Sequence, residues 1–177
     1  MMIGHRTLIT GGAGFVGSNY SKHLLDMNAE VVVFDNFARG KGCENNLHWL
    51  RSHPKSRNLK LVKGEVSSVE SLEEASKGCD LIVHTAAQVS VPESVSKPRL
   101  DFDSNALGTF NVLEVARKLQ TDPVIIYTSS NKVYGIPDAA LHELDLRYDF
   151  EDLSEEVDRV GDLANVGHSI PNPTRPV

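Results

Sequence analysis

Short apolar segments alternate with amphipathic ones along the first 130 residues of the chain. The apolar segments are rich in β-branched residues, and several are near-continuous hydrophobic runs rather than in-and-out alternations. Strands that are covered on both faces of a parallel sheet have this pattern. It predicts strands at 6–10 (RTLIT), 30–35 (EVVVFD), 59–65 (LKLVKGE), 80–86 (DLIVHTA) and 123–129 (PVIIYTS).

The segments between these strands repeat apolar residues every three or four positions, which is the spacing of one helix face. In the first of them, Val16, Tyr20, Leu24 and Met27 recur in this way. A serine before a helix can cap its first amides. The pattern predicts helices at 15–28, 43–52, 67–77 and about 100–120, with Ser67 or Ser68 capping the third and Ala106, Phe110, Leu113 and Val115 or Ala116 on one side of the fourth.

Repeated strand–helix units with right-handed crossovers build an open parallel sheet. The predicted fold class is therefore α/β, a doubly wound sheet of the Rossmann type, in which ligands bind where the strand order reverses. From Pro137 onward the chain becomes acidic and then proline-rich, without a sixth strand pattern. We expect an irregular tail over 136–177, after a ligand-binding domain over 1–135.

Composition and charge exclude several classes of protein. The formal net charge is −6, whereas nucleic-acid-binding domains usually carry a basic stripe. No segment has the roughly 18 unbroken apolar residues of a membrane span, and the first residues lack the pattern of a signal peptide. Cys43 and Cys79 have no metal-ligand spacing,. We expect a cytoplasmic protein with reduced cysteines, no metal, and neither nucleic acid nor membrane as a partner.

Three glycines in TGGAGFVG follow the first predicted strand and open the first helix. In this context Gly11 permits a tight turn, Gly14 lets the backbone approach a pyrophosphate, and Gly17 allows close helix packing. The amides of Phe15 and Val16 then point at the phosphates, and the helix dipole adds to the attraction. The motif predicts a dinucleotide site.

Asp35 stands 18 residues after Gly17, at the end of the second predicted strand. A carboxylate at that position accepts hydrogen bonds from a ribose 2′-hydroxyl and repels a 2′-phosphate. The sequence therefore predicts NAD rather than NADP as the cofactor. Arg39 is the opposing signal, because an arginine there could meet a phosphate; a solvated side chain and a cation–π contact over adenine are its other roles.

Five motifs, TGGAGFVG, FDNFARG, VHTAAQ, SNALGTFNVLE and SSNKVYG, occur in order over about 135 residues. Together they resemble the N-terminal half of an extended short-chain dehydrogenase/reductase of the NAD-dependent epimerase/dehydratase family. FDNFARGKGCENNLHWL and SSNKVYG are similar in particular to CDP-paratose (CDP-tyvelose) 2-epimerases. The segment around Asn46 serves as a marker of that subfamily, and its structural role would be helix packing.

The resemblance implies further site residues. It implies that the NAD-binding domain contacts adenine through an acidic–apolar pair, and the pyrophosphate and nicotinamide through the fourth strand, the long helix and the fifth strand. Ser130 stands at the catalytic hydroxyl position of the family. The implied cofactor contacts are Asn36, Glu65, Val66, Ala86, Ala87, Gln88, Asn105 and Tyr127.

The chemistry of the family also needs a Tyr-x-x-x-Lys pair, which these 177 residues lack. The residues four positions after the four tyrosines are Leu24, Asn131, Asp138 and Asp152. The partner of Ser130 and the substrate domain are thus expected outside this sequence. We expect little or no turnover by this chain alone, and a homodimer that truncation weakens, because only one of the two dimerisation helices of the family is present.

Three functions stay open at this stage. The first is the NAD-binding portion of a nucleotide-sugar 2-epimerase, an isomerase acting on a nucleotide sugar. The second is another nucleotide-sugar enzyme, of which a UDP-hexose 4-epimerase fits better than a dehydratase, since Asn131 and Lys132 replace the Asp-Glu pair of dehydratases. The third is a non-catalytic NAD-binding protein.

Overall fold

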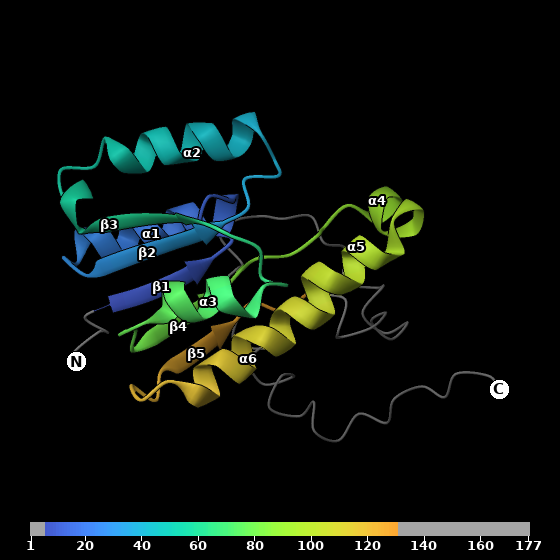
Figure 1. The fold of residues 1–177 in the computed structure, drawn as a ribbon. Coiled ribbons are helices and arrows are strands. Elements are labelled where there is room, and N and C mark those ends of the chain that lie inside the picture. The colour runs from blue at the N-terminus through green and yellow to red at the C-terminus, as the bar shows by residue number, and fades with distance from the viewer. Residues whose placement is uncertain (1–5, 131–177) are drawn as a thin grey trace, which may run out of the picture. The chain divides into compact units, whose positions relative to one another are not determined.

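The computed structural model describes residues 6–130 of the 177-residue chain. Five parallel strands form one sheet in the order β3-β2-β1-β4-β5 (Figure 1). The order reverses between β1 and β4, as a doubly wound sheet requires. The predicted fold class is confirmed. The strands are β1 (Arg6–Thr10), β2 (Glu30–Asp35), β3 (Leu59–Lys63), β4 (Leu81–His84) and β5 (Val124–Tyr127).

The first three predicted helices are present with ends shifted by a few residues, whereas the fourth, predicted at about 100–120, is divided into three helical segments over 98–118. Ser68 rather than Ser67 caps the third, and its hydroxyl accepts a hydrogen bond from the amide of Ser71 at 3.3 Å. The short helix α4 was not predicted. The helices are α1 (Phe15–Asp26), α2 (Lys41–Arg51), α3 (Val69–Ser76), α4 (Val91–Ser96), α5 (Pro98–Phe102) and α6 (Gly108–Lys118), with a 3₁₀ turn η1 (Ser56–Asn58) and a π-helical turn η2 (Asp103–Leu107) between α5 and α6.

Each face of the sheet has its own hydrophobic core. Alternate residues of the central strands point to opposite faces, so Ile9 and Leu8 enter different clusters,. α1 and α2 cover the first cluster, while α3 and α6 cover the second on the other side of the strands (Figure 1). Cys43 lies in the first and Cys79 in the second; both are free and buried, and burial raises the pKa of both thiols. Both cysteines therefore act as packing residues.

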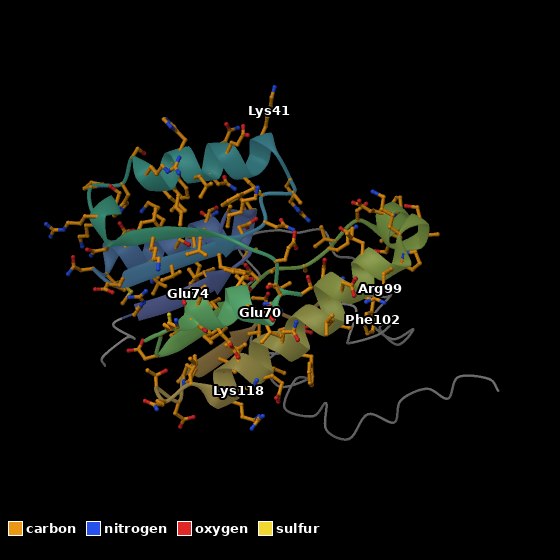
Figure 2. The ribbon with its side chains drawn as sticks, in the orientation of Figure 1. Lys41, Glu70, Glu74, Arg99, Phe102 and Lys118 are labelled. Carbon is orange, nitrogen blue, oxygen red and sulfur yellow. The ribbon has the colours of Figure 1, made fainter. Side chains whose placement is uncertain are left out.

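The long helix differs in one respect from the expected pattern. Val115 and Ala116 are buried against the sheet, whereas Phe110 and Leu113 are 58% and 47% exposed. The prediction that these residues share one side is wrong, because Val115 lies about 200° around the helix from Leu113. Phe102 of α5 continues the outer apolar surface, and its side chain projects away from the sheet (Figure 2). We call Phe102, Ala106, Phe110 and Leu113 the outer stripe.

The chain divides into two compact units, Met1–Ser129 and Ser130–Val177. The sheet and all its helices belong to the first. The expected boundary between 135 and 136 and the expected irregular tail lie outside the described residues. Within 6–130, no helix combines the length and the hydropathy that a membrane span needs.

Candidate functional site

The glycine-rich turn connects β1 to α1 at the point where the strand order reverses. Gly11 has φ +68°, and a Cβ there would lie 2.7 Å from the amide nitrogen of Ala86. A Cβ on Gly17 would overlap the carbonyl oxygen of Gly11. Both positions thus require glycine, the first for its backbone conformation and for its approach to β4, the second for the packing of α1 on the turn.

Gly14 has a different environment. Among the described residues, only the carbonyl oxygen of Gly11, at 3.1 Å, lies within 4 Å of the Cβ that another residue would carry there. Gly14 is also the N-cap of α1, and no side chain among the described residues caps that helix. Phe15 and Val16 carry exposed side chains, and helix geometry leaves their first-turn amides without intrahelical acceptors. The backbone amides of this turn can therefore bind an anionic group.

Asp35 is buried at the end of β2, and both of its carboxylate oxygens accept backbone hydrogen bonds. Oδ2 accepts from the amide of Ala13 at 3.0 Å, and Oδ1 accepts from the amide of Phe37 at 2.8 Å. The carboxylate therefore joins the glycine-rich turn to the turn after β2. Each oxygen keeps a further acceptor position, because an ionised carboxylate has about four lone-pair sites.

Asn46 is a site residue that the sequence interpretation missed. Its Nδ2 donates to the carbonyl oxygen of Ala13 at 2.8 Å, so the Ala13 residue is held at its amide by Asp35 and at its carbonyl by Asn46. Sequence reasoning placed Asn46 in a packing helix and gave it no role in the site. The only signal in the sequence is a polar residue next to the buried Leu47 of α2.

The acidic–apolar pair Glu65–Val66 directly follows β3 and Gly64. Glu65 is exposed and accepts a hydrogen bond from Asn36 Nδ2 at 3.1 Å, which links the ends of β2 and β3. Val66 is buried, and the side chain of Asn111 on α6 donates to its carbonyl oxygen at 3.1 Å. Arg39 is exposed in the turn before α2, so its side chain is available to a ligand.

The turn after β4 is held by Asn105 of η2. Asn105 Oδ1 accepts from the amide of Gln88 at 2.8 Å, and Asn105 Nδ2 donates to the carbonyl oxygen of Gln88 at 2.9 Å. The side-chain nitrogen of Gln88 is buried and has no hydrogen-bond partner within 3.5 Å among the described residues. Lys97 and, less strongly, Gln88 lower the pKa of the Glu93 carboxyl, so Gln88 lies close to that carboxylate. Ala86 is half-buried beside Gly11, and Ala87 is exposed.

The structure brings seven of the predicted cofactor residues together at the glycine-rich turn. Gly11, Gly14, Phe15, Val16, Gly17 and Asp35 surround the glycine-rich turn, and Ala86 meets it across β4. Tyr127 ends β5 and stacks on His84, with ring centroids 5.8 Å apart. Ser130 is exposed and is the first residue of the second unit.

The described residues fit an adenine dinucleotide. The open backbone at Gly14 suits a pyrophosphate, and the spare lone pairs of Asp35 suit ribose hydroxyls,. Among residues 6–130, no group of three or more His, Cys, Asp or Glu side chains could hold a metal ion.

The chain is also similar in sequence to known proteins. Residues 8–145 match the family model described as GDP-mannose 4,6 dehydratase. The chain is similar to CDP-paratose 2-epimerase of Salmonella typhi (38% identical over 146 residues, 81% of this chain and 42% of the relative). It is also similar to UDP-glucose 4-epimerase of Mycolicibacterium smegmatis (36% over 136 residues, 76% and 42%).

Solved structures of epimerases are also similar to this chain. The complex of Thermus thermophilus UDP-glucose 4-epimerase with NAD has a TM-score of 0.53 and 38% identity, over 64% of this chain and 34% of that one. The UDP-Glc/GlcNAc 4-epimerase of Campylobacter jejuni has a TM-score of 0.65 and 27% identity, over 75% and 39%. The chain thus spans about two fifths of the length of the curated relatives that it matches.

Proposed function

The chain belongs to the GDP-mannose 4,6-dehydratase family of nucleotide-sugar epimerases and dehydratases, and from this premise we propose that it is the NAD-binding portion of a nucleotide-sugar epimerase. The observation that carries the proposal is the bare helix N-terminus at Gly14 next to the buried carboxylate of Asp35. This pair of features binds a pyrophosphate and a ribose in dinucleotide-binding folds. A solved relative with 38% identity is a complex with NAD.

Within the family, the proposed substrate type is that of the CDP-paratose (CDP-tyvelose) 2-epimerases. The similarity to the Salmonella typhi enzyme supports this choice, since it extends over 81% of the chain. A UDP-hexose 4-epimerase is the second candidate, supported by the similarity to the Mycolicibacterium smegmatis enzyme. A dehydratase is less consistent with the chain, because Asn131 and Lys132 follow Ser130 in place of an acidic pair.

When bound, the dinucleotide supplies reversible hydride acceptance for the oxidation and reduction of a sugar carbon. This chain contributes binding, orientation and one hydroxyl. Asp35 and the glycine-rich turn would hold the adenosine and pyrophosphate, and the turn from Ala86 to Gln88 would hold the nicotinamide side. Ser130 would donate a hydrogen bond to a sugar oxygen. A neutral serine is a poor base at pH 7, so proton removal needs another residue.

We therefore propose that the 177-residue polypeptide binds NAD but turns over no nucleotide sugar on its own. None of its tyrosines is followed by lysine at the fourth position. The test is an epimerase assay with CDP-paratose and UDP-glucose, run beside an NAD-binding measurement on the same sample. Epimerisation of either sugar would contradict the inactivity, whereas absent NAD binding in a folded sample would contradict the function itself.

A non-catalytic NAD-binding protein is the remaining candidate of another class, and the missing Tyr-x-x-x-Lys favours it. The two candidates differ in what a full-length relative does to a nucleotide sugar. A relative that shares these motifs and carries the Tyr-x-x-x-Lys pair interconverts a CDP- or UDP-hexose if the first candidate holds. We further propose a cytoplasmic location, and self-association through the outer stripe.

A further inference from the structure

Three side chains form a row across the carboxyl end of the sheet. Thr10, His84 and Tyr127 are register partners on β1, β4 and β5. Parallel partners in register point to the same face, and the neighbouring Leu8 and Ile82 two residues earlier belong to the core under α3 and α6. Thr109 of α6 reaches His84 from that side, with its Oγ1 3.1 Å from Nε2. His84 thus lies on β4, with β1 and β5 on its two sides and α6 packed against it.

Only one assignment of donors and acceptors satisfies the hydrogen bonds around His84. Thr109 Oγ1 lies 2.7 Å from the carbonyl oxygen of Asn105, which can only accept, so the hydroxyl proton of Thr109 points there,. The Thr109 oxygen must then accept from His84 Nε2–H. With the proton on Nε2, His84 Nδ1 accepts from the hydroxyl of Thr10 at 2.6 Å. Thr10 Oγ1 in turn accepts the amide of Ala86 at 3.4 Å.

The imidazole is 2% exposed, and its hydrogen-bond partners among residues 6–130 are hydroxyls rather than charged groups. Among the described residues, the groups that contact it are the Thr10 hydroxyl from β1, the Tyr127 ring from β5 and the Thr109 hydroxyl from α6. Burial lowers the pKa of His84 to about 4. A neutral ring with one donor and one acceptor matches its two hydroxyl neighbours, whereas an imidazolium would present two donors.

Both ends of the chain of hydrogen bonds lie in the dinucleotide site. One end is the Ala86 amide, beside Gly11. The other is Asn105. Its carbonyl accepts from Thr109, and its side chain hydrogen-bonds both the amide and the carbonyl of Gln88. The two ends therefore fix the first and last residues of the turn Ala86–Gln88 against β1 and η2.

We propose that His84 is a positioning residue of the dinucleotide site, a neutral imidazole protonated on Nε2 that relays hydrogen bonds from Ala86 through Thr10 and Thr109 to Asn105. This inference rests on the proposed function for its effect on NAD. It goes further in naming a buried residue, outside the set of cofactor contacts, that sets the shape of the nicotinamide-side turn.

The protonation state is tested first, without any ligand. Long-range ¹H–¹⁵N correlation spectra of histidine-labelled protein at pH 7 separate the two neutral tautomers and the imidazolium. The spectrum of Thr109→Val, which perturbs the neighbour of His84, identifies its signal among the seven histidines. We expect the Nε2–H tautomer. A proton on Nδ1, or a doubly protonated ring, would overturn the proposal whether or not the protein binds NAD.

The effect on the site is tested with a matched pair at Thr109. Thr109→Val keeps the side-chain shape and removes the hydroxyl, while Thr109→Ser keeps the hydroxyl. Because an unsatisfied buried donor is costly, we expect Thr109→Val to raise the Kd for NAD by about fivefold or more. Thr109→Ser should restore the Kd to within about twofold. His23→Gln, an exposed histidine on α1, is the control and should bind as the parent does.

The outcomes separate the inference from the proposed function. A Thr109→Val protein that stays folded and binds NAD as tightly as the parent shows that the relay is structural only, and the proposal fails. If the folded parent binds no NAD, the proposed function fails, and the site role of His84 fails with it. Weaker NAD binding by Thr109→Val, together with parent-like binding by Thr109→Ser, supports both the inference and the proposed function.

Discussion

At the scale of single residues, the site depends on how the backbone of Ala13 is held. Its amide donates to Asp35 and its carbonyl accepts from Asn46, so the peptide units on either side have a fixed orientation. The next amide, that of Gly14, donates to the carbonyl oxygen of Gly11 at 2.9 Å and closes the turn. Preorganised backbone donors bind an anion without an ordering cost on binding.

Removing the Asn46 amide should therefore weaken NAD binding. We expect Asn46→Leu to raise the Kd for NAD by about fivefold, since a hydrogen bond of this kind contributes about 1 kcal/mol. Isothermal titration gives the Kd directly. The matched control is Asn45→Leu on the same helix, where the side chain is exposed. Equal affinity of the two variants would contradict the role of Asn46.

The pH dependence of stability reports on His84. Burial lowers its pKa in the folded state from 6.5 to about 4. Between these values the unfolded chain binds the proton and the folded protein does not, so stability falls as the pH drops from about 6.5 to about 4. The loss from this group is about 3 kcal/mol at most, at 1.36 kcal/mol per unit of pKa shift. Urea unfolding at pH 7 and pH 5 should show about 2 kcal/mol of this loss, since pH 5 lies about 1.5 units below the unfolded pKa.

His84→Gln should abolish this part of the pH dependence, while His23→Gln should keep it. The surface carboxyls whose pKa is lowered, among them Asp26 beside Lys22 and Glu114 beside Arg117, lose their stabilising pairs only below their ordinary pKa values. Their window lies mostly below pH 4.5, so the two effects separate. An unchanged slope in His84→Gln would show that the imidazole is not the group responsible.

At the scale of elements, much of the fold could be predicted because each central strand is buried on both faces. Continuous runs such as EVVVFD are typical of such strands, and β2 has the predicted bounds,. Helix α4 was missed because none of its residues is buried, so no apolar periodicity marks it. Asn46 was missed for a different reason: its partner is a backbone carbonyl 33 positions away, which no local pattern reveals.

The packing of α1 on the glycine-rich turn gives a stability prediction. A Cβ on Gly17 would overlap the carbonyl of Gly11, so we expect Gly17→Ala to destabilise the fold by about 1–3 kcal/mol,. Gly42 lies in the first turn of α2, and no other part of residues 6–130 comes within 4 Å of its Cβ position. Gly42→Ala should instead stabilise by up to about 1 kcal/mol, through helix propensity. Urea unfolding midpoints compare the two, and a Gly17→Ala protein as stable as the parent would contradict the close approach.

At the scale of the whole molecule, the described unit exposes the outer stripe along α5 to α6. Phe102, Phe110 and Leu113 are each more than two fifths exposed, and an exposed apolar surface of this kind favours association. The sequence pattern indicated an apolar face, but it assigned Val115 or Ala116 to the same side, and both of these residues pack inward. Periodicity alone does not show which side of a helix meets the sheet.

We expect the protein to self-associate through this stripe. The double variant Phe110→Lys with Leu113→Lys should shift the sedimentation profile toward the monomer, because it places two charges in the middle of the apolar surface. Asn45→Lys adds a charge on α2, which covers the other face of the sheet, and should leave the profile unchanged. Association that persists in the double variant would exclude the stripe as the contact.

The turn at Gly14 and the carboxylate of Asp35 are together proposed to form an NAD site, and the other proposals depend on that site. Isothermal titration of the 177-residue protein with NAD and with NADP tests it most directly. We predict saturable binding of NAD and at least about tenfold weaker binding of NADP, since a 2′-phosphate meets the Asp35 carboxylate. Equal affinity for the two dinucleotides, or no binding of either by the folded protein, would contradict it.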